Sequence, residues 1–405
     1  MCVELPNEAK GQSEGEEDVV GLLQMSLYGT RDAAANFQEE VKKTMTKLGF
    51  TQSRYSPSVY WHQGKDLLTL VHGDDFITTG DREHARWFKE ALEKRFEIKT
   101  KVVGMGHSES REERVLNRVL RVTEEGWEYE ADQRHAELIV EGMNLSEANS
   151  VKSPSEDERP WEEEDNDTPI PQKEAYAFRG LAARANYLAQ DRADIQFAAK
   201  EVCRGMAQPT KGHVKKLRRL ARYLIGAPRV IWKFRHQGDC DQITVYSDSD
   251  WAGCRRTARS TSGGVIMRGS HCLRTWSSTQ KFVTLSSAEA ELMAAVKAST
   301  EGIGITQLAA DWGLRARASV CVDSSAALAV VGRKGNGKLR HVRVGHLWLQ
   351  EKASMGDVSY RKVRGETNPA DLLTKSLPAH KVAMFSQDVS QYSMSGHAKV
   401  RLALH

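Results

Sequence analysis

The stretch from Val245 to Ala295 contains acidic residues whose placement could support metal-dependent chemistry. It has an acidic turn after an apolar run, then strand-like segments, then a carboxylate-bearing helix. Phosphodiester hydrolysis by two metal ions needs several carboxylates that converge on ions about 3.5 to 4 Å apart, one activating water and one stabilising the leaving oxygen. Short acidic side chains at the ends of rigid elements hold such hard cations well. The order of elements here is therefore the one that a two-metal nuclease needs.

Three strands must position the first acidic residues. β-Branched and aromatic residues predict a short strand over Ile243–Tyr246, so Asp248 and Asp250 cluster where that strand stops. The runs 260–267 and 271–278 predict a hairpin that turns around residues 268–270. The three strands should therefore lie side by side in sequence order.

A helix of small residues follows from Ser286, with one apolar face formed by Leu292, Ala295, Val296 and Ser299. Glu289 and Glu291 are two positions apart, so at about 100° per residue they diverge by roughly 200° and only one can face the sheet. We favour Glu291, which borders the packed face.

Four runs in this stretch, YSDSDWAG, RSTSGG, WSSTQK and LSSAEAE, resemble in the same order the RNase H domain of copia-type retrotransposon Pol polyproteins. The resemblance implies a mixed five-stranded sheet with helices on its faces. It also implies two bound Mg2+ or Mn2+ ions and hydrolysis of RNA in RNA–DNA hybrids. Carried over to this sequence, the catalytic and metal-binding carboxylates are Asp248, Glu291, Asp323 in CVDSSAAL and Asp371 in NPADLLTK.

Each of these carboxylates also has a structural interpretation. Asp248 or Asp250 could be a turn residue, Asp323 could cap the helix that begins in SSAALAV, and Asp371 could be a first-turn charge after Pro369. Taken as an ordered set inside family-like motifs, they favour a metal site instead. Asp250 and Glu289 are the alternative ligands.

A second pair of acidic residues lies in the N-terminal part. Strand patterns occur at 58–62, 67–71 and 76–79. The last two flank a tight turn at His72, Gly73, Asp74 and Asp75. A helix whose apolar face includes Phe37 and Met45 precedes them, and Asp81 should cap a second helix. The runs SLYGTRDAA and LLTLVHGDDFITTG resemble the reverse-transcriptase palm of the same family.

This resemblance makes Asp74 and Asp75 a vestigial polymerase metal site. His72 and Gly73 stand where the family usually has Tyr and Val, and no convincing strand carries a third aspartate ahead of the SLYG run. A bare hairpin turn is the interpretation we favour. We expect a fragment of a longer polyprotein whose polymerase part is inactive.

A basic helix is predicted after an acidic linker. Residues 153–171 contain several prolines and acidic residues and should be solvated and mobile. Three helices follow from Lys173, the first with Tyr176, Leu181, Ala185 and Leu188 on one face. The third offers a phosphate-tracking face or, nearly as well, a solvated face; its candidate nucleic-acid-binding residues are Lys211, Lys215, Lys216, Arg219 and Arg222.

Composition limits the remaining possibilities. The 405 residues carry a formal net charge of +4, and the six cysteines show no metal-ligand or disulfide spacing. With no signal-like or membrane-spanning apolar run, we expect an intracellular protein, in cytoplasm or nucleus. Nothing in the sequence indicates an oligomeric state.

The predicted fold is α+β, a partial reverse-transcriptase palm followed by an RNase H-like mixed five-stranded sheet with helices. We expect a partial polymerase domain at 1–150, a linker at 151–172, connecting helices at 173–228, the RNase H-like domain at 229–378 and a tail at 379–405. The expected function is hydrolysis of RNA in hybrids. The alternatives are an inactive remnant that binds nucleic acid and an RNA-directed DNA polymerase completed by another chain.

Overall fold

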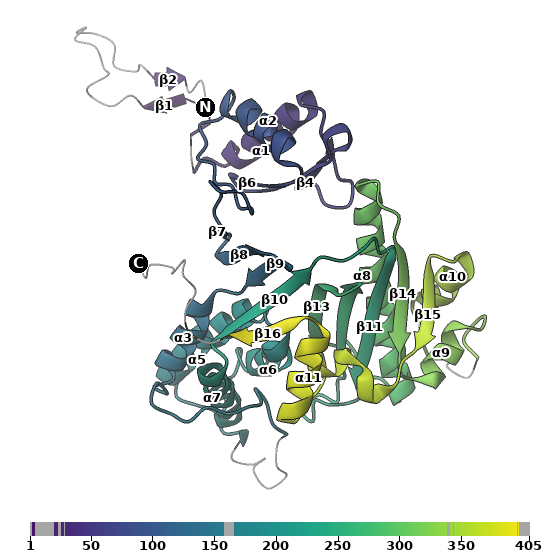
Figure 1. The fold of residues 1–405 in the computed structure, drawn as a ribbon. Helices are drawn as coiled ribbons and strands as arrows, with labels where there is room; N and C mark the ends of the chain where they lie inside the picture. Colours follow the sequence, from purple (N-terminus) through teal and green to yellow (C-terminus); the bar gives the residue numbers. More distant parts are fainter. Residues whose placement is uncertain are drawn as a thin grey trace. The chain divides into compact units, whose positions relative to one another are not determined.

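The computed structural model describes residues 2–4, 20–22, 26–27, 29–157, 166–337, 341–342, 344–394 and 396 (Figure 1). It forms two compact units, one of Met1–Thr100 with Ala310–Gly313 and one of Lys101–Ala309 with Leu314–His405. The predicted boundary at residue 150 is therefore wrong, because residues 101–150 fold with the second unit. No helix of the described residues is long and apolar enough to cross a membrane.

The first unit is built on a small antiparallel sheet. Its order is β3 (Thr51–Gln52), β4 (Val59–His62), β5 (Leu67–His72) and β6 (Asp75–Thr79). The helices α1 (Ala33–Lys47) and α2 (Arg82–Glu93) supply Met45 and Phe88 to a core that also contains Leu67. Asp81 caps α2 as predicted, accepting from the backbone N–H groups of Glu83 and His84.

A separate two-stranded antiparallel pair, β1 (Cys2–Glu4) and β2 (Val20–Leu22), lies near the N-terminus of the chain. The remainder of the acidic N-terminal segment is outside the described residues. A complete polymerase palm is not among the described elements.

The second unit contains the predicted mixed five-stranded sheet. Its order is β13 (His271–Thr279), β12 (Thr261–Arg268), β11 (Gln242–Asp250), β14 (Arg317–Val322) and β15 (Val358–Lys362). The pairs β13–β12 and β12–β11 are antiparallel, and the pairs β11–β14 and β14–β15 are parallel. The hairpin around Gly269 confirms the predicted strand order, and β11 continues well past Tyr246 to Asp250.

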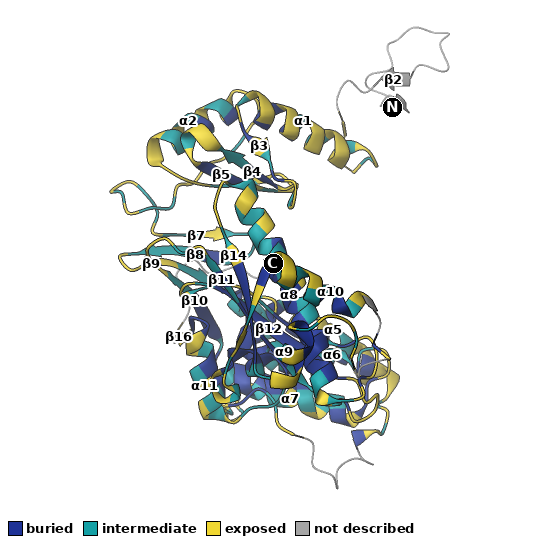
Figure 2. Cartoon of the chain, turned by 90° about the vertical axis from the view of Figure 1, so that its right-hand side faces the viewer, coloured by how far each residue is buried: buried dark blue, intermediate teal, exposed yellow. Residues whose placement is uncertain are grey.

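Both faces of this sheet are covered, which makes its central strands largely buried (Figure 2). On one face Val245 and Ile266 pack with Leu292 of α8 (Ser287–Asp311), and α9 (Ser325–Val331) and α10 (Trp348–Met355) extend the same core. On the other face Val265 packs with Phe385 of α11 (Ala379–Asp388). The 3-10 helix η6 (Pro369–Leu373) and α6 (Ala193–Cys203) also lie on this second side.

A second five-stranded sheet is antiparallel throughout. Its order is β16 (Gln391–Met394), β10 (Arg229–Arg235), β9 (Gly126–Glu130), β8 (Arg118–Thr123) and β7 (Glu112–Val115). Residues 229–235 therefore do not belong to the mixed sheet, contrary to the predicted start of the C-terminal domain at residue 229. Residues 379–394 are no free tail either, because α11 fills a core and β16 pairs with β10 (Figure 1).

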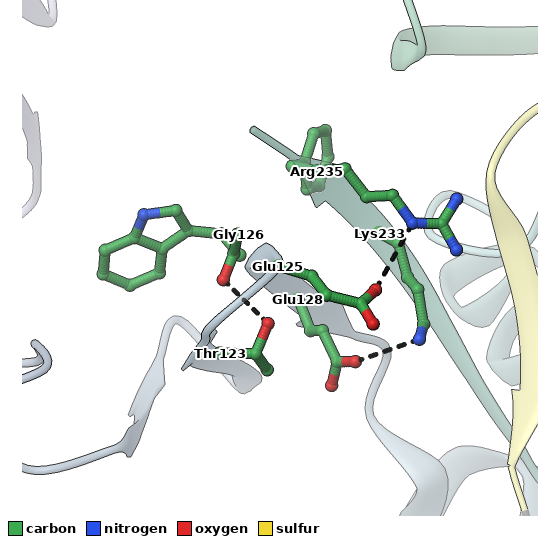
Figure 3. Close-up of a pocket in the computed structure, with 8 residues that line it drawn as sticks. Thr123, Glu125, Gly126, Glu128, Lys233 and Arg235 are labelled. Atoms are coloured by element: carbon green, nitrogen blue, oxygen red, sulfur yellow. Dashed lines mark hydrogen bonds and ion pairs between the residues drawn. The ribbon is translucent and has the colours of Figure 1, made fainter. Parts of the chain in front are cut away.

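Ion pairs join the neighbouring strands of this second sheet. Lys233 of β10 lies 3.6 Å from Glu128 of β9, and Arg235 lies 3.4 Å from Glu125 in the preceding turn (Figure 3). The hollow that these side chains line has a volume of about 10 Å³, roughly enough for one water molecule. It is too small to be a ligand site.

A helical layer packs beside the second sheet. It comprises α3 (Gln133–Gly142), α5 (Gln172–Leu188), α6 and α7 (Lys211–Gly226), which share one core. Tyr176 was predicted on the packed face of α5, but it is 82% exposed, and Phe178 and Ala182 fill that face instead. The other residues predicted on this face agree with the structure, because Ala185 and Leu188 are buried and Leu181 packs against the same core.

The predicted linker is ordered at both of its described ends. Ser153 is buried, and its hydroxyl donates to the carbonyls of Ser155 and Leu377. The backbone of Pro169 forms an isolated antiparallel β-bridge with Thr210, at the start of α7. Most of the acidic run, residues 158–165, lies outside the described residues. The prediction of a mobile linker is therefore wrong for the described flanks, because their backbone is held by hydrogen bonds.

Candidate metal centre

Asp248 lies on the central strand of the mixed sheet. It stands within β11, opposite Gly263 of β12, and the residue is 2% exposed. The prediction that β11 stops before Asp248 is wrong, because pairing with β12 continues through Asp250. A carboxylate in this position is held by a strand that has neighbours on both sides, so its backbone has little freedom.

Glu291 reaches Asp248 from helix α8. Its Oε1 accepts hydrogen bonds from the backbone N–H and the hydroxyl of Ser249, both at 3.0 Å. Its Oε2 is buried and has no hydrogen-bond partner among the described residues. A buried, unpartnered carboxylate oxygen is costly, so this atom indicates a missing cation or donor.

Glu289 has a different role in the same helix. Its Oε2 accepts from the backbone N–H of Leu285 at 2.7 Å and lies 3.1 Å from Nε2 of His341. Both glutamates are buried, which the sequence did not predict, but Glu289 is buried by the loop that precedes α8. Its hydrogen bonds at the helix start are those of a capping residue.

Asp323 follows the carboxyl end of β14. The cap of α9 is Ser324, whose hydroxyl accepts from the backbone N–H of Ala327, so Asp323 does not serve as the cap. One carboxylate oxygen from each of Asp248, Glu291 and Asp323 lies within 4.8 Å of the others. Parallel β11 and β14 thus bring two of the predicted residues to one place, and α8 adds the third.

Asp371 lies in η6, and a hydrogen bond from Asn368 holds this 3-10 helix against β11. Asn368 is fully buried; its Nδ2 donates to the carbonyl of Ser247 at 2.9 Å, and its Oδ1 accepts from the backbone N–H of Ala370 at 3.2 Å. Across the sheet, Gly263 makes room for η6, since a Cβ there would lie 2.6 Å from Cγ2 of Thr374. The glycines of RSTSGG therefore have a packing role that the motif alone did not reveal.

Asp371 completes the acidic group beside Asp248. Lys375 Nζ lies 2.9 Å from Oδ1 of Asp371 and 3.8 Å from Oδ2 of Asp248. The hydroxyl of Thr374 donates to Oδ2 of Asp248. Three groups that sequence reasoning missed, Asn368, Thr374 and Lys375, thus support the site. All three flank Asp371 in the run NPADLLTK, and that proximity was the available signal.

The crowding of carboxylates shows in their pKa values. Burial, followed by the charges of Asp248 and Asp323, raises the pKa of Glu291 to about 8. Burial and the charge of Asp248 raise the pKa of Asp371 to about 7 and also raise that of Asp323. Like charges forced together in a partly dry site favour the protonated forms, and a divalent cation would reverse that preference.

The donor set fits hard divalent cations. Each of the four side chains offers carboxylate oxygens, the ligand that Mg2+ and Mn2+ prefer. The group from Asp248, Glu291 and Asp323 is the one convergent acidic cluster of its kind found in the described part of the chain. Asp250, the other alternative ligand, ends β11, and burial followed by the charge of Asp248 raises its pKa.

The second acidic pair is placed quite differently. Asp74 and Asp75 lie at the β5–β6 hairpin, where His72 pairs with Asp75 and Gly73 has a φ of +62°. Both aspartates are exposed. The positive φ at Gly73 suits a two-residue hairpin turn.

The predicted basic face of α7 is partly engaged in internal contacts. Arg219 donates to the carbonyl of Ser153 at 3.1 Å and pairs with Glu156 at 2.7 Å, and Arg222 donates to the carbonyl of Asn149 at 2.9 Å. Lys216 lies 3.5 Å from Glu201 of α6. These contacts attach the segment after α3 to α7, so the two arginines have a structural role.

The chain is similar to curated retrotransposon proteins over most of its length. It is 26% identical over 373 residues to the retrovirus-related Pol polyprotein from transposon RE1 of Arabidopsis thaliana, covering 88% of this chain and 24% of that polyprotein. It is 25% identical over 400 residues to the one from transposon TNT 1-94 of Nicotiana tabacum, covering 94% and 29%. The chain thus spans about a quarter of the length of these relatives.

Solved structures of RNase H domains are similar at low identity. The N-terminal RNase H domain of a Mycobacterium tuberculosis protein is 16% identical and covers 36% of this chain and 96% of that chain, with a TM-score of 0.25. LC11-RNase H1 in complex with an RNA/DNA hybrid is 18% identical and covers 33% and 93%, with a TM-score of 0.24.

No family model matches the sequence. The RE2 polyprotein of Arabidopsis thaliana gives the same result as RE1, at 25% identity over 92% of this chain and 25% of that polyprotein. The curated homologues that this chain resembles over most of its length are therefore copia-type retrotransposon Pol polyproteins.

Proposed function

We propose that this chain hydrolyses the RNA strand of RNA–DNA hybrids at the site formed by Asp248, Glu291, Asp323 and Asp371. One observation carries the proposal: oxygens of three carboxylates, from β11, α8 and the end of β14, lie within 4.8 Å of one another in a largely buried place. A cluster of that kind is unfavourable without a cation. The motifs that deliver these residues support the choice of a nuclease.

The chain's own residues would divide the work of holding two ions. Asp248, Glu291 and Asp323 would hold one, and Asp248 would share the other with Asp371, which lies beside it. When bound, the ions supply an activated water and stabilise the leaving oxygen of the phosphodiester. Ser249 orients Glu291 through two hydrogen bonds, and Asn368 fixes the segment that carries Asp371.

The substrate class follows from the family resemblance of the motifs and from the retrotransposon relatives. A hybrid would be recognised by its backbone shape and by the 2′-hydroxyl groups of its RNA strand. The ribose hydroxyl is what distinguishes RNA from DNA at such a site. The predicted substrate is therefore RNA paired with DNA, and neither duplex DNA nor free RNA should replace it.

The test uses the full 405-residue chain and a labelled RNA annealed to DNA. We expect RNA cleavage in Mg2+ or Mn2+, none after chelation, and recovery when the metal is restored. The same RNA alone and the matching DNA duplex are the controls. Hybrid that is bound but never cut in either metal would support a nucleic-acid-binding remnant and contradict the nuclease.

A further inference from the structure

Lys375 is a basic side chain that pairs with two of the proposed metal ligands, Asp371 and Asp248. It follows Thr374 directly, and its side chain is 41% exposed, whereas that of Asp248 is 3% exposed. Its ammonium lies 2.9 Å from Asp371 and 3.8 Å from Asp248. The lysine therefore lies at the solvent side of the Asp248–Asp371 pair, four residues after Asp371.

The charge of Lys375 offsets part of the repulsion between the two neighbouring carboxylates. Its ammonium lies within ion-pairing distance of both Asp371 and Asp248. A positive charge close to two negative charges is attracted to both of them and stabilises their proximity.

A divalent ion and this ammonium need the same oxygens. Mg2+ binds carboxylate oxygens at about 2.0 to 2.1 Å with strict octahedral geometry, so an ion shared by Asp248 and Asp371 would lie where the lysine charge now points. The divalent ion and the lysine ammonium would repel each other if both stayed beside these carboxylates. The side chain of Lys375 is only partly covered, so its ammonium can move away from the carboxylates toward solvent.

We infer that Lys375 is a built-in counterion that occupies the Asp248–Asp371 pair and is displaced when a divalent ion binds there. The inference rests on the proposed function, because it takes these two residues as ligands. The lysine holds the acidic group together when metal is scarce, and it raises the metal concentration at which the second ion is held. Lys375 is in this sense a positioning residue that sets metal affinity.

The experiment compares Lys375→Met with the wild-type chain and with Lys381→Met as the matched control. Lys381 is the same residue type in the neighbouring α11, and its ammonium donates to the backbone carbonyl of Glu366. Mg2+ and Mn2+ binding is measured by titration calorimetry, and thermal unfolding is measured in chelator and in saturating Mg2+. Neither readout depends on nuclease activity.

We expect Lys375→Met to bind the more weakly held ion about fivefold more tightly than the wild type, since no ammonium has to be displaced. In chelator the variant should melt below the wild type, and the gap should close in saturating Mg2+. Lys381→Met should show neither change in metal affinity nor a metal-dependent gap. If Lys375→Met does not fold in chelator, Lys375→Gln is titrated instead.

Unchanged or weaker metal binding in the Lys375 variants would overturn the inference. Such a result would mean that the lysine is a bystander or assists metal binding. A wild-type chain that binds no divalent ion at all would instead overturn the proposed function. The two failures are therefore distinguishable within one set of titrations.

Discussion

The chain carries two groups of acidic residues that resemble metal sites of the same retroelement family, and their structures differ in one decisive respect. Asp248, Glu291, Asp323 and Asp371 come from four elements, β11, α8, the end of β14 and η6. Asp74 and Asp75 come from a single hairpin and are both exposed. The first group converges because a packed sheet and helix force it together, whereas the second is held only by a turn.

This difference shows what distinguishes a group of carboxylates that could hold a metal ion from an isolated acidic motif. Convergence of side chains from several rigid elements creates an unfavourable concentration of charge, visible in the raised pKa values of Glu291 and Asp371. Such a group gains much from a divalent cation. Two exposed neighbours on a turn have no comparable penalty to relieve, so their sequence resemblance alone predicts little chemistry.

The largest expected effect is on cleavage by single carboxamide variants. Asp248→Asn or Asp323→Asn should lower the hybrid cleavage rate by about 1,000-fold, because the loss of one charged ligand weakens binding of at least one ion. Asp74→Asn is the control and should leave the rate unchanged. Rates are measured at equal protein and saturating Mg2+. Full-rate cleavage by both Asp248→Asn and Asp323→Asn would contradict the assignment.

The second effect is a pH-dependent stability of the metal-free protein. The folded-state pKa of Glu291 is about 8, above its ordinary value of 4.5, so the folded state keeps a proton that the unfolded state loses. Stability should therefore fall as pH rises from about 4.5 to 8 and level off above it, by roughly 2 to 4 kcal/mol.

Chemical denaturation at pH 5.5 and at pH 8.5, in chelator, measures this loss. Saturating Mg2+ should reduce it, because a bound cation compensates the ionised carboxylates. The variant Glu291→Gln should have a flatter pH profile. Stability that rises across the same pH window in chelator would show that the carboxylates are not crowded in solution.

A smaller effect is expected from the basic face of α7. Arg219→Gln with Arg222→Gln should lower the free energy of unfolding by about 1 to 3 kcal/mol, because hydrogen bonds to the carbonyls of Ser153 and Asn149 are lost. The salt dependence of hybrid binding should change by less than one slope unit per residue. A decrease of two full units with unchanged stability would make this face the phosphate-tracking surface.

The smallest effect is expected at the hairpin. Asp74→Asn with Asp75→Asn should change neither stability nor hybrid cleavage, since both side chains are exposed. The chain should also fail to extend a primer on an RNA template, because two neighbouring aspartates cannot surround both ions that nucleotide transfer needs. Template-dependent incorporation above a no-protein control, lost in the double variant, would show a working polymerase site.

Local sequence patterns predicted individual elements well, whereas the mixed five-stranded sheet was expected from the family resemblance. The hairpin around Gly269, the cap at Asp81 and the helix after Ser286 all agree with the structure. The end of β11 was missed because Ser247, Asp248 and Ser249 are polar, and only pairing with β12 keeps them in the strand. Tertiary context overrides local preference in such cases.

The non-local features could not be predicted. Nothing in the residues 379–394 reveals that they fill a core and extend a sheet whose other strands begin at Glu112. Asn368 and Lys375 adjoin a predicted ligand, but their roles depend on what lies across from them: the carbonyl of Ser247 and the carboxylate of Asp248. Sequence periodicity indicates which face of an element is buried and cannot indicate its partner.

The pairing of β16 with β10 has a consequence for how the protein is made. The strand β10 begins at Arg229, yet its outer neighbour β16 begins only at Gln391. During synthesis β10 is therefore available long before its partner, and its free edge presents unpaired N–H and C=O groups. We expect this sheet to form late and slowly, because the entropy of loop closure is lost before the contacts between distant strands stabilise the sheet. Nascent chains halted before Gln391 should therefore be the forms most prone to aggregate.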